Sequence, residues 1–248
     1  MASSETGHGI NSSNLDTMVK VCIGLGTGYN PSNPLLQITS LTALNTSAAA
    51  VIKKLSDAES AWKKALGERE IIFKPLKPLV TRVIKALKTS EVPEPIIDNA
   101  ITLQKKLQGT RASSLDEPEP PADGAAAGDT SLHHSASQLS FDNRILNMAK
   151  LVSLLAVQPM YMPNETDLTV AALTELQTNM NTSNEAVKDA VRPIENARAE
   201  RDKIFYTEKT GLVDVALLVK TYIQSAFGTK SPQYKQVSKL KFTRLSQD

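Results

Sequence analysis

Residues 19–30 read VKVCIGLGTGYN, a short apolar run followed by alternating glycines. Loops of this kind cradle phosphates when a strand precedes them, a helix follows at once and an acid stands about 20 residues further on. Gly24 and Gly26 fit that pattern, but Tyr29 occupies the third glycine position and residues 44–50, LNTSAAA, contain no acid. We therefore interpret the stretch as a helix end that runs into a glycine-rich turn, and we expect no phosphate there.

Histidine and cysteine, two residue types that hold metals and serve in nucleophilic sites, are scarce in this sequence. The histidines are His8, His133 and His134, in the N-terminal tail and a linker, and Cys22 is the single cysteine. The helices therefore offer neither the Glu-x-x-His pairs of a di-metal bundle nor the usual Ser-His and Cys-His nucleophile pairs. We expect no catalytic residue, no metal and no cofactor; an enzyme that uses carboxylates or lysines alone is the alternative.

A basic segment, TKSPQYKQVSKLKFTR, occupies residues 229–244. Its candidate partner- or anion-binding residues are Lys230, Lys235, Lys239, Lys241 and Arg244, interleaved with Tyr234 and Phe242. Such a pattern can contact phosphates and stack bases, so nucleic acid or an anionic membrane surface is an alternative partner. The sequence contains two related repeats, at 13–111 and 141–248, and the earlier segment ITLQKKLQGTR, residues 101–111, occupies the matching place in the first of them. This correspondence favours a docked terminal element with a solvated basic face.

The composition favours helices. Of the 248 residues, 41% are hydrophobic and only 4% aromatic, so alanine, leucine and valine must form most of the core. The net charge of +2 is too balanced to indicate a polyelectrolyte partner. The N-terminus lacks the features of a secretory signal, and no apolar stretch reaches the roughly 18 residues that span a bilayer. We expect a soluble cytoplasmic protein without a membrane span, and a single cysteine fits that reducing compartment.

The sequence aligns with itself at a shift of 132 positions. Between residues 29–89 and 161–221 no gap is needed and 18 of 61 positions are identical, whereas chance gives about one position in seventeen. The identical pairs include Tyr29/Tyr161, Pro31/Pro163, Leu41/Leu173, Glu68/Glu200, Arg69/Arg201, Phe73/Phe205 and Lys88/Lys220. We interpret this as a tandem duplication, with repeats at 13–111 and 141–248. Residues 1–12 are expected to form a disordered tail, and the Pro-, Ala- and acid-rich residues 112–140 a flexible linker.

Each repeat is predicted to contain one long amphipathic helix and several shorter helices. The apolar stripe of the long helix runs from Leu41 to Ile72 in the first repeat and from Leu173 to Ile204 in the second. A helix of about 36 residues would be about 54 Å long. We therefore expect an all-α fold of two elongated, coiled-coil-like bundles, with a pseudo-twofold axis as one arrangement.

The shorter elements are predicted from caps and prolines. First helices are expected at 14–23 and 142–157, the second capped by Asp142. Third helices are expected at 79–89 and 212–227, and short fourth elements after Pro95 and Pro232. Pro193 falls inside the second long helix and predicts a kink there.

A Glu-Arg pair recurs near the end of each long helix, as Glu68-Arg69 and Glu200-Arg201. One interpretation is a binding patch. We favour a salt-bridged end of the helix pair, in which the arginine stems cover apolar surface.

The second repeat contains the segments TGLVD, residues 210–214, and SPQYKQ, residues 231–236. Over about residues 140–244 the chain resembles a group of uncharacterised bacterial helical proteins, which carry similar TGLVD and SPQYKQ segments. The resemblance implies a bacterial origin and an all-helical fold, and brings no activity, cofactor or catalytic residue. The paired amphipathic faces and the duplication lead us to expect a non-enzymatic structural or interaction protein that self-associates or scaffolds a protein partner.

Overall fold

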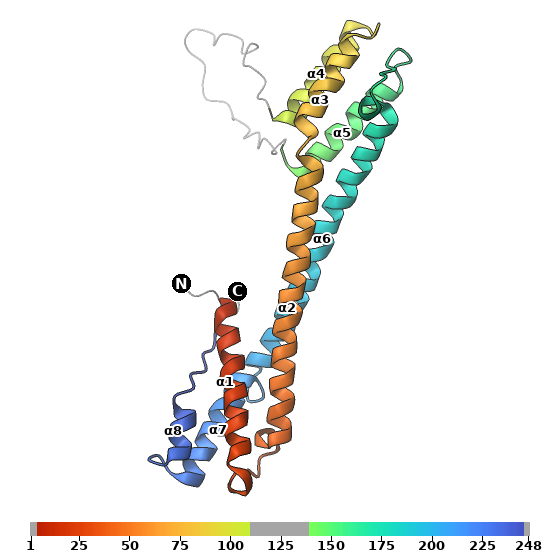
Figure 1. Cartoon of the computed structure of the whole chain (residues 1–248). Coiled ribbons are helices and arrows are strands. Elements are labelled where there is room, and N and C mark those ends of the chain that lie inside the picture. Colours follow the sequence, from red (N-terminus) through yellow and green to blue (C-terminus); the bar gives the residue numbers. More distant parts are fainter. Residues whose placement is uncertain (1–3, 110–138, 246–248) are drawn as a thin grey trace, which may run out of the picture. The chain divides into compact units, whose positions relative to one another are not determined.

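The computed structural model describes residues 4–109 and 139–245, with side chains from residue 7 onward (Figure 1). Throughout that part every regular element is helical, which confirms the predicted all-α class. The α-helices are α1 (Ser4–Gly24), α2 (Ile38–Phe73), α3 (Leu76–Lys88), α4 (Glu94–Gln108), α5 (Phe141–Ala156), α6 (Val170–Tyr206), α7 (Leu212–Phe227) and α8 (Pro232–Ser238). Three 3-10 turns join them: η1 (Gly26–Gly28), η2 (Pro34–Leu36) and η3 (Thr166–Leu168).

The two long helices form where the apolar stripes predict them. α2 has 36 residues and α6 has 37, and α6 continues through Pro193. The stripe positions are buried or half-buried along both helices, including Leu41, Ala48, Val51 and Leu55 on α2 and Leu173, Met180, Val187 and Ala197 on α6. Period-3.6 patterning over ten turns is a strong local signal, and the register of both helices follows it.

The N-terminal residues differ from the expected disordered tail. α1 begins at Ser4, and the side chains of His8 and Asn11 are 2% and 1% exposed. The amide of Asn11 donates to the carbonyl of Thr243 at 2.8 Å, and its oxygen accepts from the Thr243 backbone N–H at 3.1 Å. This polar stretch lacks a helical pattern of its own. Its helix is therefore stabilised by contacts with residues that lie more than 200 positions away in the sequence.

The predicted cap of α5 and the predicted linker before it can be compared with the structure. Ser140, rather than Asp142, is the N-cap, and its Oγ accepts from the backbone N–H of Asn143 at 3.2 Å. Asp142 lies in the first turn, where its carboxylate contacts Lys188 and Asn184. Of the expected linker 112–140, all but the last two residues lie outside the described part.

The described chain forms two compact units, and each draws on both predicted repeats. The first unit contains residues up to Lys63 and from Asp189 onward; the second contains Lys64–Lys188. In the first unit α1 packs on α7 and α8, and η2 packs on α7. In the second, α5 packs on α4, and η3 packs on α3. The bundles defined by packing are therefore not the repeats defined by sequence.

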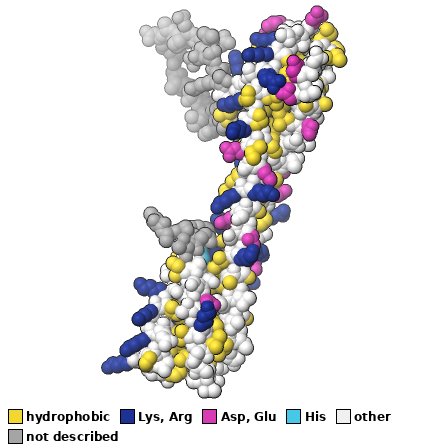
Figure 2. Space-filling view, in the orientation of Figure 1, with side chains coloured by type: hydrophobic (Ala, Val, Ile, Leu, Met, Phe, Trp, Pro, Cys, Tyr) yellow, Lys and Arg dark blue, Asp and Glu magenta, His cyan; other side chains and the backbone are white. Residues whose placement is uncertain are grey.

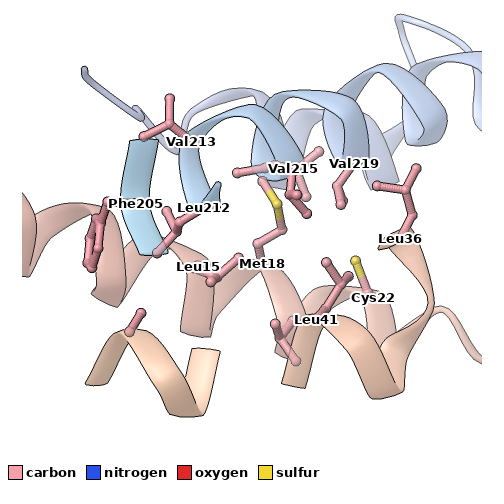
Figure 3. Close-up of a cluster of buried hydrophobic side chains, with 14 of the residues drawn as sticks. Leu15, Met18, Cys22, Leu36, Leu41, Phe205, Leu212, Val213, Val215 and Val219 are labelled. Atoms are coloured by element: carbon pink, nitrogen blue, oxygen red, sulfur yellow. The ribbon is translucent and has the colours of Figure 1, made fainter. Parts of the chain in front are cut away.

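The core of the first unit joins helices from opposite ends of the chain (Figure 3). Leu15 and Met18 of α1 belong to the same cluster as Val215 of α7 and Phe205 of α6, all with at most 1% of their surface exposed. Cys22 belongs to the same cluster, and burial raises its thiol pKa to about 11. At neutral pH this thiol stays protonated and packs as a small apolar side chain.

The core of the second unit forms within the central segment Lys64–Lys188. Leu76, Val80 and Leu87 of α3 pack with residues of α4 and α5. The remaining fully buried members of this cluster are Val83, Ala100, Leu107, Met148, Leu151, Leu155, Leu173 and Met180. α3 thus supplies an apolar face that packs on α4 of its own repeat and on η3 of the other repeat.

A tyrosine holds the turn before each long helix. The Tyr29 hydroxyl donates to the carbonyl of Leu36 at 2.7 Å, and the Tyr161 hydroxyl donates to the carbonyl of Leu168 at 2.8 Å. Both rings are buried, and burial raises the pKa of Tyr161 to about 12. These residues and their spacing are among the positions that the two repeats share.

Replacing either tyrosine by phenylalanine is expected to lower the free energy of unfolding by about 1–3 kcal/mol, because a buried carbonyl would lose its donor. Urea titrations of Tyr29→Phe and Tyr161→Phe measure this. Tyr234→Phe, at a half-buried site on α8, is the control and should change stability by less than about 0.5 kcal/mol. Losses no larger than that of the control would show that the two hydroxyls do not support the turns.

Candidate interaction surfaces

The basic segment forms α8 and the extended residues after it. Ser231 caps α8 by accepting the Tyr234 backbone N–H at 3.1 Å, and Pro232 occupies the first turn, where a missing N–H costs nothing. Lys230, Lys235, Lys239 and Lys241 are all exposed, and we call them the lysine surface. Within residues 7–109 and 139–245 none of the four has a carboxylate at ion-pair distance. Figure 2 shows Lys and Arg side chains projecting over α8.

Arg244, the fifth predicted site residue, is placed differently. Its Nη2 contacts both carboxylate oxygens of Asp214, at 2.7 and 2.8 Å, and its Nη1 donates to the Tyr206 carbonyl at 3.3 Å. Lys220 donates to the carbonyl of Leu240, and its Nζ lies 5.4 Å from the centre of the Phe242 ring. The segment is thus docked on α6 and α7, and its four lysines project to solvent.

The Arg244–Asp214 pair is expected to make stability depend on pH. Hydrogen bonds from Arg244 and from the Lys209 backbone N–H lower the pKa of Asp214 in the folded state. The pair therefore stabilises the fold above the ordinary carboxyl range, and this contribution disappears as the pH falls through the lowered pKa. Because Arg244 is half exposed, Arg244→Gln should cost at most about 1 kcal/mol at neutral pH. Urea titrations between about pH 7 and pH 3 should show the difference shrinking; a constant difference would contradict this account.

The glycine-rich stretch is the end of α1 followed by η1. α1 ends at Gly24, and no strand precedes the turn in the described part. Gly26 has φ +54°, a left-handed conformation that glycine adopts without strain. The Asn30 backbone N–H donates to the Tyr222 hydroxyl at 3.0 Å, so it already has a partner. The interpretation as a helix end and turn is confirmed.

The corresponding turn of the second repeat exposes large apolar side chains. In residues 157–163, VQPMYMP, the exposed fractions are 72% for Val157, 50% for Met160 and 83% for Met162. We call these three residues the methionine turn. Met160 and Met162 also line a cavity of about 700 Å3, together with Arg82, Lys85 and other residues of α3. Unbranched methionines adapt to varied partners, and such exposed patches often mark interaction sites.

The two recurring Glu-Arg pairs have different surroundings. Glu200 pairs with Lys54 at 2.6 Å, and Arg201 with Asp202 at 2.8 Å. The guanidinium carbon of Arg69 instead lies 3.7 Å from the centre of the Phe141 ring, and its Nη1 donates to Asn184 Oδ1 at 2.9 Å. Arg69 therefore covers an aromatic ring with its guanidinium, whereas ion pairing is seen at Glu200 and Arg201.

Sequence reasoning missed Arg144 and Asn184. The guanidinium carbon of Arg144 lies 5.1 Å from the Phe73 ring centre, and Asn184 connects Arg69 to Asp142. Asn184 aligns with Ile52 in the first repeat, so the duplication carries no signal for it. Both roles arise from contacts between residues that are far apart in sequence.

The histidines offer no shared site. His8 is buried on α1 against Phe205 and Tyr206, whereas His133 and His134 lie outside the described residues. Within residues 4–109 and 139–245 no group of three His, Cys, Asp or Glu side chains is placed to hold a metal ion.

None of the helices in the described part of the chain is long and apolar enough to span a membrane. Comparisons with protein-family models, with curated proteins and with solved structures found no match to this chain.

Proposed function

We propose that this chain is a non-enzymatic interaction protein that assembles with a protein partner, a second copy of itself being the first candidate. The observation that carries this proposal is the methionine turn. Val157, Met160 and Met162 expose 50–83% of their surface within seven residues. Because these side chains are already partly covered, burying the rest of each would contribute at most about 1.5–3 kcal/mol, which is a part of the free energy that association through a larger surface requires.

The proposal is tested by the double variant Met160→Ser/Met162→Ser. Light scattering after size exclusion, over a range of protein concentrations, should show association in the natural protein and its weakening in the variant. Ile23→Ser is the control, because Ile23 is 53% exposed at the end of α1 and lies outside the methionine turn. A natural protein that stays monomeric, and captures the same proteins from lysate as the double variant, would refute the proposal.

We infer that the two repeats arose by tandem duplication and are related by a pseudo-twofold axis. Three parallels support this: the two tyrosine-held turns, the burial of both aligned residues Phe73 and Phe205, and three helix or turn contacts that recur in both units, namely α1–α8 with α5–α4, α7–α8 with α3–α4, and η2–α7 with η3–α3. Residues 141–248 expressed alone should then pair with a second copy and give a two-chain mass by light scattering. A helical monomer that unfolds cooperatively would count against the inference.

A reducing bacterial cytoplasm is the compartment we propose for this protein. The single buried thiol of Cys22 and the resemblance of about residues 140–244 to bacterial sequences support it. Fractionation of the source cells would test it, and recovery from an oxidising compartment would overturn it.

A second candidate function is binding to nucleic acid or another anionic surface through the lysine surface. Four exposed lysines without carboxylate partners among the described residues favour it. Anisotropy titrations with single- and double-stranded DNA should show affinity that falls steeply with salt and is weakened by Lys235→Gln/Lys239→Gln. Lys105→Gln/Lys106→Gln on α4 removes the same charge as a control. Absence of binding at low salt, to DNA and to anionic vesicles alike, would end this candidate.

A further inference from the structure

The second unit contains a cavity of about 840 Å3 at the junction of α2, α3 and α5. Its volume lies within the range of small-molecule sites. Four of its lining residues are cationic: Arg69 and Lys74 from α2 and its end, Lys77 from α3 and Arg144 from α5. Its other lining residues are Leu66, Gly67, Glu70, Ile71, Phe73 and Phe141. The cavity therefore combines an apolar wall with an excess of positive charge.

The positive charges of this cavity are not neutralised within the described part of the chain. Among the described residues, no carboxylate lies at ion-pair distance from either of the two arginines or either of the two lysines, although Glu70 also lines the cavity. Burial lowers the pKa of Arg144, which reflects the cost of desolvating its charge. A bound anion would offset part of that desolvation free energy, because a close counter-charge stabilises a partly buried cation more than an exposed one.

The two arginines are held in place by aromatic rings. Arg69 stacks on Phe141 and Arg144 lies over Phe73, while the two rings meet edge to face with centroids 4.9 Å apart. Such stacking fixes a guanidinium without neutralising its charge.

Both guanidiniums have hydrogen-bonding capacity that the described residues leave unused. The Nε atoms of Arg69 and Arg144 are buried without a partner among those residues, so a ligand in the cavity would be contacted by the outer Nη groups, over which the same positive charge is delocalised. Arg144 Nη2 reaches the Phe73 carbonyl only at 3.4 Å. Guanidinium N–H groups suit the oxygens of phosphate, sulfonate and carboxylate groups, and charge-assisted bonds to such oxygens are the stronger kind.

We propose that this cavity binds a small organic anion, in which a phosphate, sulfonate or carboxylate group is joined to an apolar body. Arg69 and Arg144 contact the oxyanion, and the lysines add longer-range attraction. The apolar body lies against Leu66 and Ile71. Ile71 supports an apolar body in particular, because 72% of its surface is exposed at the cavity wall. This site is independent of the assembly role proposed for the methionine turn.

The probe for this site is 1-anilinonaphthalene-8-sulfonate, whose fluorescence rises when it leaves water. We expect saturable one-to-one binding to the full chain, weakened about tenfold or more by Arg69→Gln and by Arg144→Gln. Arg192→Gln is the matched control, because Arg192 is an exposed arginine on α6 outside the cavity, and it should leave the titration unchanged. Met160→Ser/Met162→Ser should also leave it unchanged, which separates this site from the assembly surface.

A third variant blocks the cavity without altering its charge. Gly67 lines the cavity within α2, and a Cβ atom added there meets nothing within 4 Å. Gly67→Phe should therefore keep the fold, since glycine is a poor residue inside a helix, and it should displace the probe. Circular dichroism of each variant verifies folding before the titration.

Competition identifies the chemistry of the ligand. Octyl phosphate and octanoate should displace the probe at lower concentration than inorganic phosphate, and octanol should compete least. Equal displacement by octanol would mean that the probe reports apolar surface alone, which would overturn the proposal. It would also fail if folded Arg69→Gln, Arg144→Gln and Gly67→Phe proteins all bound the probe as the natural chain does, or if Arg192→Gln weakened binding equally.

Discussion

A single cut within residues 112–138 is expected to leave two fragments that remain tightly associated. The first fragment carries α1–α4 and the second α5–α8, yet both compact units need helices from each. In the first unit Leu15 and Met18 pack with Phe205 and Val215; in the second, helices α3 and α4 share their core with α5. Burial of a dozen such side chains, at about 1.5–3 kcal/mol each, outweighs the entropy of association and predicts a dissociation constant below about 1 µM.

The measurement needs a protease site inserted between residues 112 and 138. After cleavage, size exclusion with light scattering should give one species with the mass of both fragments. The fragments should separate only in denaturant, together with the loss of helical circular dichroism. The uncut protein carrying the same insertion is the control. Two folded fragments that elute separately in native buffer would show that the units do not draw on both repeats.

Phe205→Ala is expected to lower the free energy of unfolding by about 3–5 kcal/mol. Phe205 is 0% exposed, and its ring meets those of His8 and Tyr206 at centroid distances of 5.6 and 6.0 Å. Truncation would remove the aromatic contacts and leave a cavity where α1, α6 and α7 meet. Because His8 belongs to α1, the loss should weaken the ordering of the N-terminal helix as well.

Urea titration followed by circular dichroism measures this loss, and hydrogen exchange shows where it falls. Exchange should accelerate in α1 and α7 more than in α4 and α5, because Phe205 belongs to the core of the first unit. Phe73→Ala, at the aligned position of the other repeat, should reverse that pattern. Ile71→Ala is the control, since 72% of that side chain is already exposed. A Phe205→Ala loss below about 1 kcal/mol would contradict the packing described here.

The sequence by itself was enough to predict the all-α class, the bounds of α2 and α7 within a few residues, and the turns before the long helices. These features depend on short-range physics. Apolar residues such as Leu41, Leu44 and Ala48 recur at helical spacing, and Gly211 and Pro232 stand beside helix starts. Alignment of the repeats added the pairing of Tyr29 with Tyr161, because it showed which turn residues recur.

Only the tertiary structure decided which faces meet. The start of α1 at Ser4, the docking of Arg244 on Asp214, and the cluster of Arg69, Arg144 and Asn184 all join residues far apart in the chain. A periodic apolar stripe specifies that a helix face is buried, but the hydrophobic effect is non-directional and does not specify the partner. The sequence therefore predicts two repeated sets of helices, and packing combines them into units that each contain helices of both repeats.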